Sequence, residues 1–499
     1  MHIYHNKTSI GIVIFMTGMM ASCKQMPAKS NQATQPNILF IAVDDLRPDI
    51  NAYGNSLMIT PHIDELAKEG RLFLNHYVNV PTCGASRYAM LTGRYPQNTD
   101  ALQNNIFERT TAIQTQSKST PETFIELFRS NGYHTIGIGK ISHAADGRVY
   151  AYDQPVSNNR ELPNSWDELL FNAGKWGTGW NAFFGYANGD NRVGQHSEVK
   201  PYESANINDE GLPDGLTASL AVSQLRSLKN TNKPFFLAVG FFKPHLPFTA
   251  PKKYWDLYHE NSIPLSPIQN IPENVNVASL HNSPEFNQYK KGEEHPDINH
   301  PVSDAYAKKI RHAYFAAISY VDAQIGKVLQ ALKKTGLDRN TIVVLWGDHG
   351  WHLGDQRMWG KHSLSEYALK SALIIKYPGM PAPGIANNSI VQSVDIYPTL
   401  LDLTHLKSKS ALNGTSLVKQ LRNVKVHSVN RAYSYFNKGI SLRIPRYRIT
   451  KYYRNEKPTV ELYDYLLDPF ETKNIADKNK MLIDSLLPIL ETGNTGLYQ

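Results

Sequence analysis

Four short apolar runs, each followed directly by charged or titratable residues, constrain the fold of this chain more than any other feature. Apolar and polar residues do not alternate within the runs, so a strand with one solvent-exposed face is not indicated. Unbroken runs of this length are typical of parallel strands that helices cover on both faces. With their polar endings, the runs are NILFIAVDD (37–45), HTIGIGKISH (134–143), PFFLAVGFFKPH (234–245) and NTIVVLWGDHG (340–350).

Helical patterns lie between the apolar runs, as in TPHIDELAKEG (60–70), TPETFIELFRSNG (120–132) and a long segment at 312–336. This order predicts an α/β fold with a large mixed, mostly parallel sheet flanked by helices. Alternation in RAYSYFNKGISLRIPRYRITKYY (431–453) indicates a smaller antiparallel sheet near the C-terminus. We therefore expect a main domain at 37–425 and a C-terminal subdomain at 426–499.

The charge balance points to a polyanionic partner. The chain has 499 residues, of which 41% are hydrophobic and 19% charged, and its formal net charge is +8. This composition is that of an ordinary globular protein, and a positive balance favours nucleic acid, a membrane surface or an acidic polysaccharide. No RNA- or DNA-binding signature is present in the sequence, so we expect no nucleic-acid partner.

The N-terminus has the features of an export signal. His2, His5 and Lys7 precede an apolar stretch at 10–20 that is too short to span a bilayer, and MASC (20–23) follows. MASC resembles a bacterial lipobox, which predicts a signal peptide at 1–22 and lipidation of Cys23. The alternative is an ordinary secretory signal with an incidental cysteine.

Under the lipobox interpretation, the polar segment 23–36 is a flexible tether. The chain would then be an exported bacterial lipoprotein in the periplasm or at the outer membrane or cell surface. Its membrane contact would be made through the lipid anchor.

Candidate metal ligands follow two of the apolar runs. Asp44 and Asp45 end the first run, and Asp348 and His349 end the last one. Parallel strands bring their carboxyl ends to one edge of the sheet, where ligands bind. Three carboxylates at one edge repel each other unless a cation lies between them, and oxygen ligands suit a hard divalent cation. Each pair taken alone is also consistent with a helix N-cap or a turn.

Titratable cations accompany these acidic residues. The basic or imidazole side chains near the run endings are Lys140, His143, His245 and Lys361. Such groups suit the binding and proton transfer that an anionic substrate requires. The alternative for Lys140 and Lys361 is that they only neutralise the acidic cluster.

Cys83 lies in VPTCGASRYAMLTGRYP (80–96) and is the only cysteine besides Cys23, so the mature chain offers it no disulfide partner. The stretch from Cys83 resembles the sulfatase signature, a cysteine in C-x-(P/A)-x-R followed by a leucine-threonine-glycine-arginine segment. Further motifs of type I sulfatases in the alkaline phosphatase superfamily occur in order. They are ILFIAVDDLRPD, GKISH, FFKPHLPF, WGDHGWHLGDQRMWGKHS and ELYDYLLDPFETKNIA.

The resemblance spans about residues 36–476 and makes 37–425 a sulfatase catalytic domain. The Asp348-His349 pair, KPHLPF and WGKHS are similar to iduronate-2-sulfatases. The family implies that Cys83 is converted to formylglycine by a formylglycine-generating enzyme or a radical maturase. Ala85 stands where the commonest signature has proline, which leaves the maturation route open.

The resemblance also implies a mechanism. The formylglycine hydrate carries two hydroxyl groups, one to attack sulfur and one to expel sulfate afterwards. By analogy, Ca²⁺ would be held by Asp44, Asp45, the side chain at Cys83, Asp348 and His349. His349 departs from an all-oxygen set and could instead orient the substrate.

The remaining roles follow from the same analogy. Arg87 would brace the hydrate, and Lys140 and Lys361 would meet charge that develops on the sulfuryl group. His245 would protonate the leaving alcohol and His143 would act as base, although these two could exchange roles.

The sequence therefore predicts a sulfuric ester hydrolase that acts on a sulfated polysaccharide or its oligosaccharides. We expect a 2-O-sulfated uronate or iduronate unit of a glycosaminoglycan or of an algal polymer such as ulvan. The alternatives are a phosphatase or phosphonate hydrolase of the same superfamily, and a non-catalytic polysaccharide-binding lipoprotein.

Two further segments lack an assigned role. The region 403–455 has no Asp or Glu and interleaves arginines with tyrosines, which indicates either a basic, aromatic platform for a sugar chain or a solvated sheet face. The Pro- and Asn-rich segment 262–304 predicts a long irregular insertion near the mouth of the site.

Overall fold

The four apolar runs of the sequence are adjacent parallel strands. In the computed structural model, β1 (Asn37–Val43) pairs with β8 (Thr341–Gly347) on one side and with β6 (Phe235–Phe241) on the other. β6 pairs in turn with β3 (His134–Gly139). Because all four run in one direction, their carboxyl ends and the polar residues that follow meet at one edge of the sheet.

The sheet has eight strands in the order β12-β2-β11-β8-β1-β6-β3-β4. β11 (Leu373–Lys376) is antiparallel to both of its neighbours, and the other pairings in the sheet are parallel. The remaining strands are β2 (Arg71–Tyr77), β4 (Glu168–Leu170) and β12 (Asn387–Gln392). The prediction of a mixed, mostly parallel sheet is confirmed.

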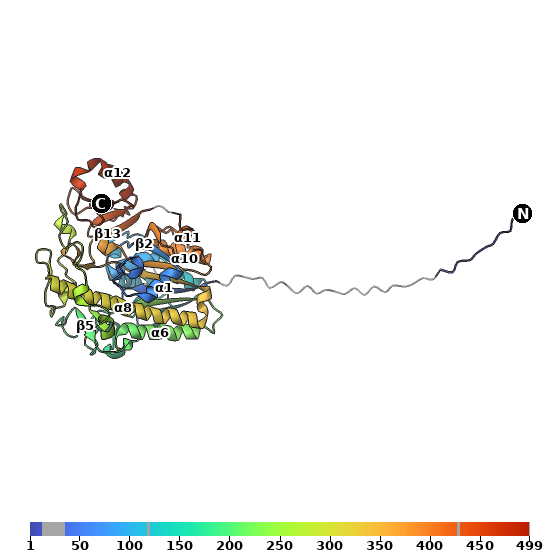
Figure 1. Cartoon of the computed structure of the whole chain (residues 1–499), viewed down its shortest axis with the longest axis horizontal. Helices are drawn as coiled ribbons and strands as arrows, with labels where there is room; N and C mark the ends of the chain where they lie inside the picture. Colours follow the sequence, from blue (N-terminus) through green and yellow to red (C-terminus); the bar gives the residue numbers. More distant parts are fainter. Residues whose placement is uncertain (12–34, 117–119, 427–429, 499) are drawn as a thin grey trace. The chain divides into compact units, whose positions relative to one another are not determined.

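Helices cover both faces of this sheet, as the unbroken apolar runs require (Figure 1). In β1, Leu39 and Ile41 belong to one buried cluster and Ile38 and Phe40 to the opposite one. The first cluster includes residues of α1 (Pro61–Glu69), α6 (Pro213–Leu228) and α8 (Asp304–Thr335). The second includes residues of α2 (Cys83–Thr92), α3 (Ile106–Thr115), α4 (Phe124–Ser130), α10 (Ile396–Thr404) and α11 (Val418–Arg422).

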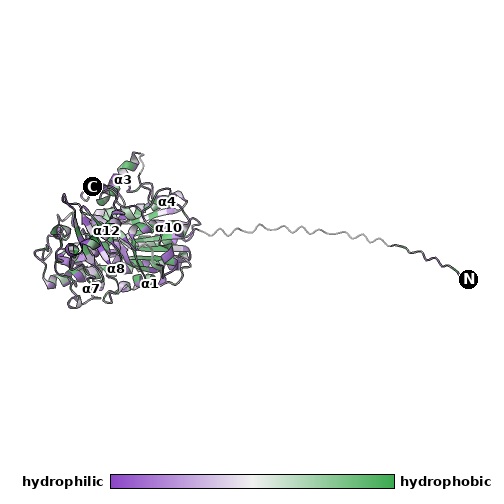
Figure 2. Cartoon of the chain, turned by 90° about the horizontal axis from the view of Figure 1, so that it is seen from above, coloured by the Kyte–Doolittle hydropathy of each residue, from purple (hydrophilic) through white to green (hydrophobic). Residues whose placement is uncertain are grey.

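The strands of the central sheet are coloured mostly as hydrophobic in Figure 2, because both of their faces are covered. Short elements complete the connections around it. They are α5 (Gly179–Phe183), α7 (Lys252–Trp255), α9 (Glu366–Leu369), β5 (Tyr202–Ala205), β7 (Phe248–Pro251), β9 (His352–Leu353) and β10 (Trp359–Gly360).

A four-stranded antiparallel sheet forms near the C-terminus, as the alternating pattern predicts. Its strands, in spatial order, are β13 (Ala432–Phe436), β14 (Gly439–Arg443), β15 (Tyr447–Tyr452) and β16 (Thr459–Asp464), and α12 (Lys480–Glu491) follows. Tyr435 and Leu442 of this sheet share one buried cluster with Val80 and Ala85, which flank Cys83. The small sheet therefore supports the segment that carries the cysteine. The boundary at 425/426 stays a prediction.

Several basic and aromatic residues of the small sheet are interior. Arg448 is 1% exposed and pairs with Glu471 at 2.7 Å between Nε and Oε1, and Tyr435 is fully buried. The side chains of Arg448 and Tyr435 bind other parts of the chain. These two residues therefore belong neither to a polymer-binding platform nor to a solvated sheet face.

The structure describes residues 1–11, 35–116, 120–426 and 430–498. Residues 1–11 have no helix or strand, whereas Gln35–Gln499 form one compact unit. Cys23 and most of the predicted leader and tether lie outside the described residues. Within the described ranges, no helix combines the length and hydropathy needed to cross a bilayer. Up to the start of α8 at Asp304, the helical elements of the segment 262–304 are short 3-10 turns, so the prediction of an irregular insertion is confirmed.

Candidate functional site

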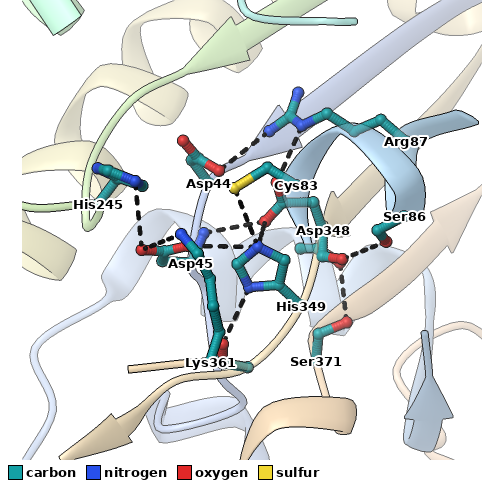
Figure 3. Close-up of polar contacts among 12 residues, drawn as sticks. Asp44, Asp45, Cys83, Ser86, Arg87, His245, Asp348, His349, Lys361 and Ser371 are labelled. Atoms are coloured by element: carbon teal, nitrogen blue, oxygen red, sulfur yellow. Dashed lines mark hydrogen bonds and ion pairs between the residues drawn. The ribbon is translucent and has the colours of Figure 1, made fainter. Parts of the chain in front are cut away.

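The ends of β1 and β8 place four side chains together (Figure 3). Asp44 and Asp45 follow β1, Asp348 and His349 follow β8, and all four are fully buried. The Asp45 backbone N–H donates to Asp348 Oδ1 at 3.0 Å, which joins the two strand ends directly. The parallel pairing of two apolar runs thus concentrates three carboxylates at one point.

Cys83, at the start of α2, completes this cluster. Its Sγ lies 3.2 Å from Nε2 of His349, and one donor atom from each of Asp44, Asp45, Cys83 and His349 lies within 4.8 Å of the others. Buried carboxylate oxygens at such separations fit a divalent cation. Asp348 adjoins the group, with Oδ1 3.7 Å from His349 Nε2.

The pKa values of the three carboxyl groups at this edge are shifted in different directions. Burial raises the pKa of Asp45 well above its ordinary value, and burial and the neighbouring Asp44 carboxylate also raise the pKa of Asp348. Burial opposes ionisation of Asp44 as well, but the Lys140 ammonium and other cations hold its pKa well below the ordinary value. A divalent cation would relieve the repulsion among these carboxylates, so the residues present fit a metal site.

Arg87 and Lys140 anchor the acidic side of the site. Arg87 Nε donates to Asp348 Oδ2 at 2.9 Å, and its Nη2 lies 3.5 Å from Asp44 Oδ1. Lys140, directly after β3, places Nζ 2.6 Å from Asp44 Oδ2 and 4.1 Å from the centre of the Phe183 ring. Both cations are buried beside the thiol of Cys83.

Lys361 and His245 approach from the opposite side. Lys361 Nζ lies 3.1 Å from Asp45 Oδ1, and His245 Nε2 lies 3.9 Å from Asp45 Oδ2. The Nδ1 atom of His245 is 2.6 Å from the Leu246 carbonyl oxygen, so it donates this bond and leaves Nε2 facing the cluster. The imidazole is therefore oriented by the loop that follows β6.

His143 is less tightly integrated than the other predicted residues. Its ring centre lies 5.4 Å from that of Trp180, and its buried Nδ1 has no hydrogen-bond partner among the residues that the structure describes. Burial and the Lys140 charge lower its pKa well below the ordinary value. A neutral imidazole in this position can accept a proton.

The unmodified Cys83 thiol is a poor nucleophile in this setting. Burial raises its pKa to about 12, so the sulfur is protonated at neutral pH. Because the thiolate is the reactive form of cysteine, the unmodified Cys83 side chain is unreactive at neutral pH, although it lies at the centre of the cluster.

Two family models match the chain. The model described as Sulfatase covers residues 36–406, which include every predicted catalytic and metal-binding position. The chain belongs to the sulfatase family. A second model, N-sulphoglucosamine sulphohydrolase, C-terminal, matches residues 347–488 of this sulfatase.

Curated relatives of the sulfatase cover most of its length. A sulfatase from Formosa agariphila is 32% identical over 488 residues, covering 95% of this chain and 90% of its own. The iduronate 2-sulfatase of Mus musculus is 30% identical over 431 residues, covering 78% and 73%. The family assignment and the similarity to iduronate 2-sulfatases are therefore confirmed.

Solved structures share the fold of the sulfatase. The phosphonate monoester hydrolase of Agrobacterium radiobacter superposes with a TM-score of 0.72 at 22% identity, covering 92% of this chain and 96% of its own. A 2-O GAG sulfatase gives a TM-score of 0.61 at 23% identity, covering 92% and 90%. At these identities the likeness shows the α/β fold with its C-terminal antiparallel sheet.

Glu285 is a site residue of the sulfatase that sequence reasoning missed. It lies in the irregular insertion, and its Oε1 is 3.0 Å from His245 Nε2 and 3.1 Å from Lys361 Nζ. The insertion was predicted to lie near the mouth of the site, and these contacts confirm it. No periodic pattern or motif surrounds Glu285, so the sequence has no local signal that singles out this residue.

Proposed function

We propose that this sulfatase removes sulfate esters from a sulfated polysaccharide or its oligosaccharides. The preferred unit is a 2-O-sulfated uronate or iduronate of a glycosaminoglycan or of an algal polymer such as ulvan. The 30% identity to iduronate 2-sulfatase supports the uronate, and an ulvan-active sulfatase of Formosa agariphila is 26% identical over 484 residues. A net charge of +8 favours such a polyanionic substrate.

The observation that carries the mechanism is the burial of a single sulfur among metal-ligand side chains. Cys83 Sγ, Asp44, Asp45 and His349 place their donor atoms within 4.8 Å of one another. Formylglycine at this position, made by a formylglycine-generating enzyme or a radical maturase, would supply a hydrate with one hydroxyl to attack sulfur and one to expel sulfate.

The carboxylates of the cluster would hold the cation. Asp44, Asp45 and Asp348, with His349 and the modified side chain at 83, would bind Ca²⁺, which supplies Lewis-acid polarisation of a sulfate oxygen. Arg87 keeps Asp348 in place through the 2.9 Å contact.

Cationic side chains would bind the transferring group. Lys140 and Lys361 flank Cys83 and would donate hydrogen bonds to the sulfuryl oxygens as negative charge develops there. The Nε2 of His245 faces the cluster and would protonate the leaving alcohol. His143, with its unpartnered Nδ1, would accept the proton when the second hydroxyl expels sulfate.

Mass spectrometry and sulfate release test this proposal together. The peptide that carries Cys83 should be about 18 Da lighter than the unmodified peptide, because the thiol is replaced by an aldehyde. Cys83→Ala should abolish sulfate release while melting at the same temperature as the parent protein. Cys83→Ser should release at most one sulfate per chain, since no second hydroxyl remains. Full activity in a preparation whose Cys83 is entirely thiol would overturn the mechanism.

We further propose that the protein is exported and lipid-anchored through Cys23. The basic start, the short apolar stretch and MASC in the sequence support this location. A surface or periplasmic position suits an enzyme whose substrate is a polymer.

A further inference from the structure

Arg192 is a buried arginine for which the described part of the chain provides no carboxylate partner. Its residue surface is 7% exposed, and no Asp or Glu within ion-pair distance of its guanidinium occurs among the described residues. Other buried arginines bind within the protein, as Arg87 and Arg448 do with carboxylates and Arg71 with backbone carbonyls. A buried cation without a partner is costly, so Arg192 calls for an explanation in terms of a ligand.

Two aromatic rings hold the Arg192 guanidinium. Its Cζ lies 3.8 Å from the centre of the Phe184 ring and 5.4 Å from that of Tyr289. Stacking on aromatic faces fixes the plane of the guanidinium. The Tyr289 hydroxyl also interacts with it through a hydrogen bond, and no carboxylate of the described residues takes up the other N–H groups. Tyr289 belongs to the same insertion as Glu285, so the insertion helps to build both positions.

Phe184 connects Arg192 with the catalytic cluster. Its ring centre lies 6.4 Å from that of His245 and 5.3 Å from that of Tyr152. The guanidinium is therefore one aromatic ring away from the imidazole that faces the leaving group.

Tyr152 lies close enough to both Lys140 and Arg192 for their charges to affect its pKa. Its side chain is 41% exposed, and its ring packs edge-on against Trp180 at 4.6 Å between centres. Partial burial raises the pKa of Tyr152, and the charges of Lys140 and Arg192 both oppose this rise. The hydroxyl of Tyr152 thus lies in the fields of a cation at the sulfuryl position and of the unpaired arginine.

We propose that Arg192 binds the carboxylate of the sugar whose sulfate ester is cleaved, and so selects sulfated uronates over neutral sulfated sugars. This inference rests on the proposed function. A planar guanidinium matches the two oxygens of a carboxylate with two parallel hydrogen bonds. Burial of the guanidinium against the Phe184 and Tyr289 rings lowers the local dielectric and thereby strengthens the contact. A second sulfate group offers similar oxygens, and the experiment separates the two anions.

The experiment compares a 2-O-sulfated uronate oligosaccharide with its carboxyl-reduced counterpart, in which a hydroxymethyl group replaces the carboxylate. The parent enzyme should prefer the uronate. Arg192→Gln should lower kcat/KM for the uronate by about 30-fold or more, mainly through KM, and for the reduced substrate by about threefold or less. The matched control is Arg226→Gln, an exposed arginine of α6, which should keep the full preference.

A conservative variant guards against a folding defect. Arg192→Lys keeps the charge but loses the planar fork, so it should raise KM for the uronate several-fold and leave the reduced substrate less affected. Melting temperatures of all variants should be measured alongside. Retained selectivity for the uronate in Arg192→Lys and Arg192→Gln would overturn the proposal.

Further results of the same experiment would contradict carboxylate binding by Arg192 or the proposed function on which it rests. Equal losses on both substrates, or losses that follow the number of sulfates and not the carboxylate, would overturn carboxylate binding by Arg192. A parent enzyme that cleaves other sulfate esters but shows no preference for the uronate would overturn this inference and the uronate assignment while leaving sulfatase activity intact. Absence of turnover on every sulfate ester, with formylglycine present, would overturn the proposed function itself.

Discussion

Glu285 Oε1 lies 3.0 Å from His245 Nε2 and couples an irregular insertion to the imidazole of the site. The same oxygen is 3.1 Å from Lys361 Nζ. Burial opposes ionisation of Glu285, but Lys361 and His245 hold its pKa well below the ordinary value, so it is a carboxylate. Burial and the Lys361 ammonium lower the pKa of His245 to about 4, and the ionised Glu285 opposes this lowering and fixes the orientation of the imidazole.

Glu285→Gln should therefore weaken protonation of the leaving group. We expect kcat for a sulfated oligosaccharide to fall by about tenfold with a smaller change in KM. The loss for 4-nitrophenyl sulfate should be much smaller, because a phenolate leaves without a proton.

Glu273→Gln is the control for this prediction, since Glu273 lies in the same insertion and is exposed. Equal losses on the sugar and aryl substrates would show that Glu285 does not act through His245.

Removal of divalent cations should abolish sulfate release, and Ca²⁺ should restore it. Binding of the ion to the folded state alone should also raise the free energy of unfolding, by about 2.7 kcal/mol at a hundred times Kd, and with it the melting temperature. Asp45→Asn should lose this thermal shift, because Asp45 contributes a carboxylate to the cluster.

Asp338→Asn provides the matched control for the metal, because Asp338 precedes β8 at the end opposite to Asp348. It should keep both the shift and the activity. Full activity in a metal-stripped sample would contradict the metal assignment.

Arg448 should be essential for the stability of the small C-terminal sheet. Its guanidinium binds Glu471 at 2.7 Å and Glu366 at 2.5 Å, and all three side chains are largely buried. Arg448→Ala would leave the buried Glu471 carboxylate without an ion-pair partner among the described residues, whereas Glu366 keeps Lys370 and Arg443 nearby. The substitution should cost about 3–5 kcal/mol in urea unfolding.

Arg446→Ala is the comparison for Arg448→Ala, because Arg446, directly before β15, pairs with Asp464 of β16 but is 47% exposed. Its loss should be much smaller, since solvent screens the pair. Similar losses in both variants would argue against the buried network.

Cys23→Ser tests the anchor. If MASC is a lipobox, the variant should appear in the soluble fraction and retain its turnover, because Cys23 lies outside the catalytic unit Gln35–Gln499. The variant is compared with the parent protein by fractionation and by metabolic labelling with a fatty acid. Continued labelling and membrane association of Cys23→Ser would exclude lipidation at this residue.

The central sheet and the main chemistry of the site could be predicted from the sequence alone. Apolar runs without alternation can only be stable where both faces are covered, and parallel pairing then brings the run endings to one edge. The apolar pattern of each strand is therefore enough to predict that the residues after β1 and β8 meet. These residues are Asp44, Asp45, Asp348 and His349. Cys83 is identifiable because its signature is a continuous stretch of sequence.

The contacts of the other residues follow from the tertiary structure and could not be predicted from the sequence. Glu285 and Tyr289 come from an insertion without periodicity, and Arg192 carries no motif, so nothing near them in the sequence indicates the rings and imidazole that they contact. Arg448 is likewise interior because Glu366 and Glu471 reach it from distant segments. Local patterns fix which residues form strands and helices. The partner of a buried charge depends on long-range packing, which no short window of sequence contains.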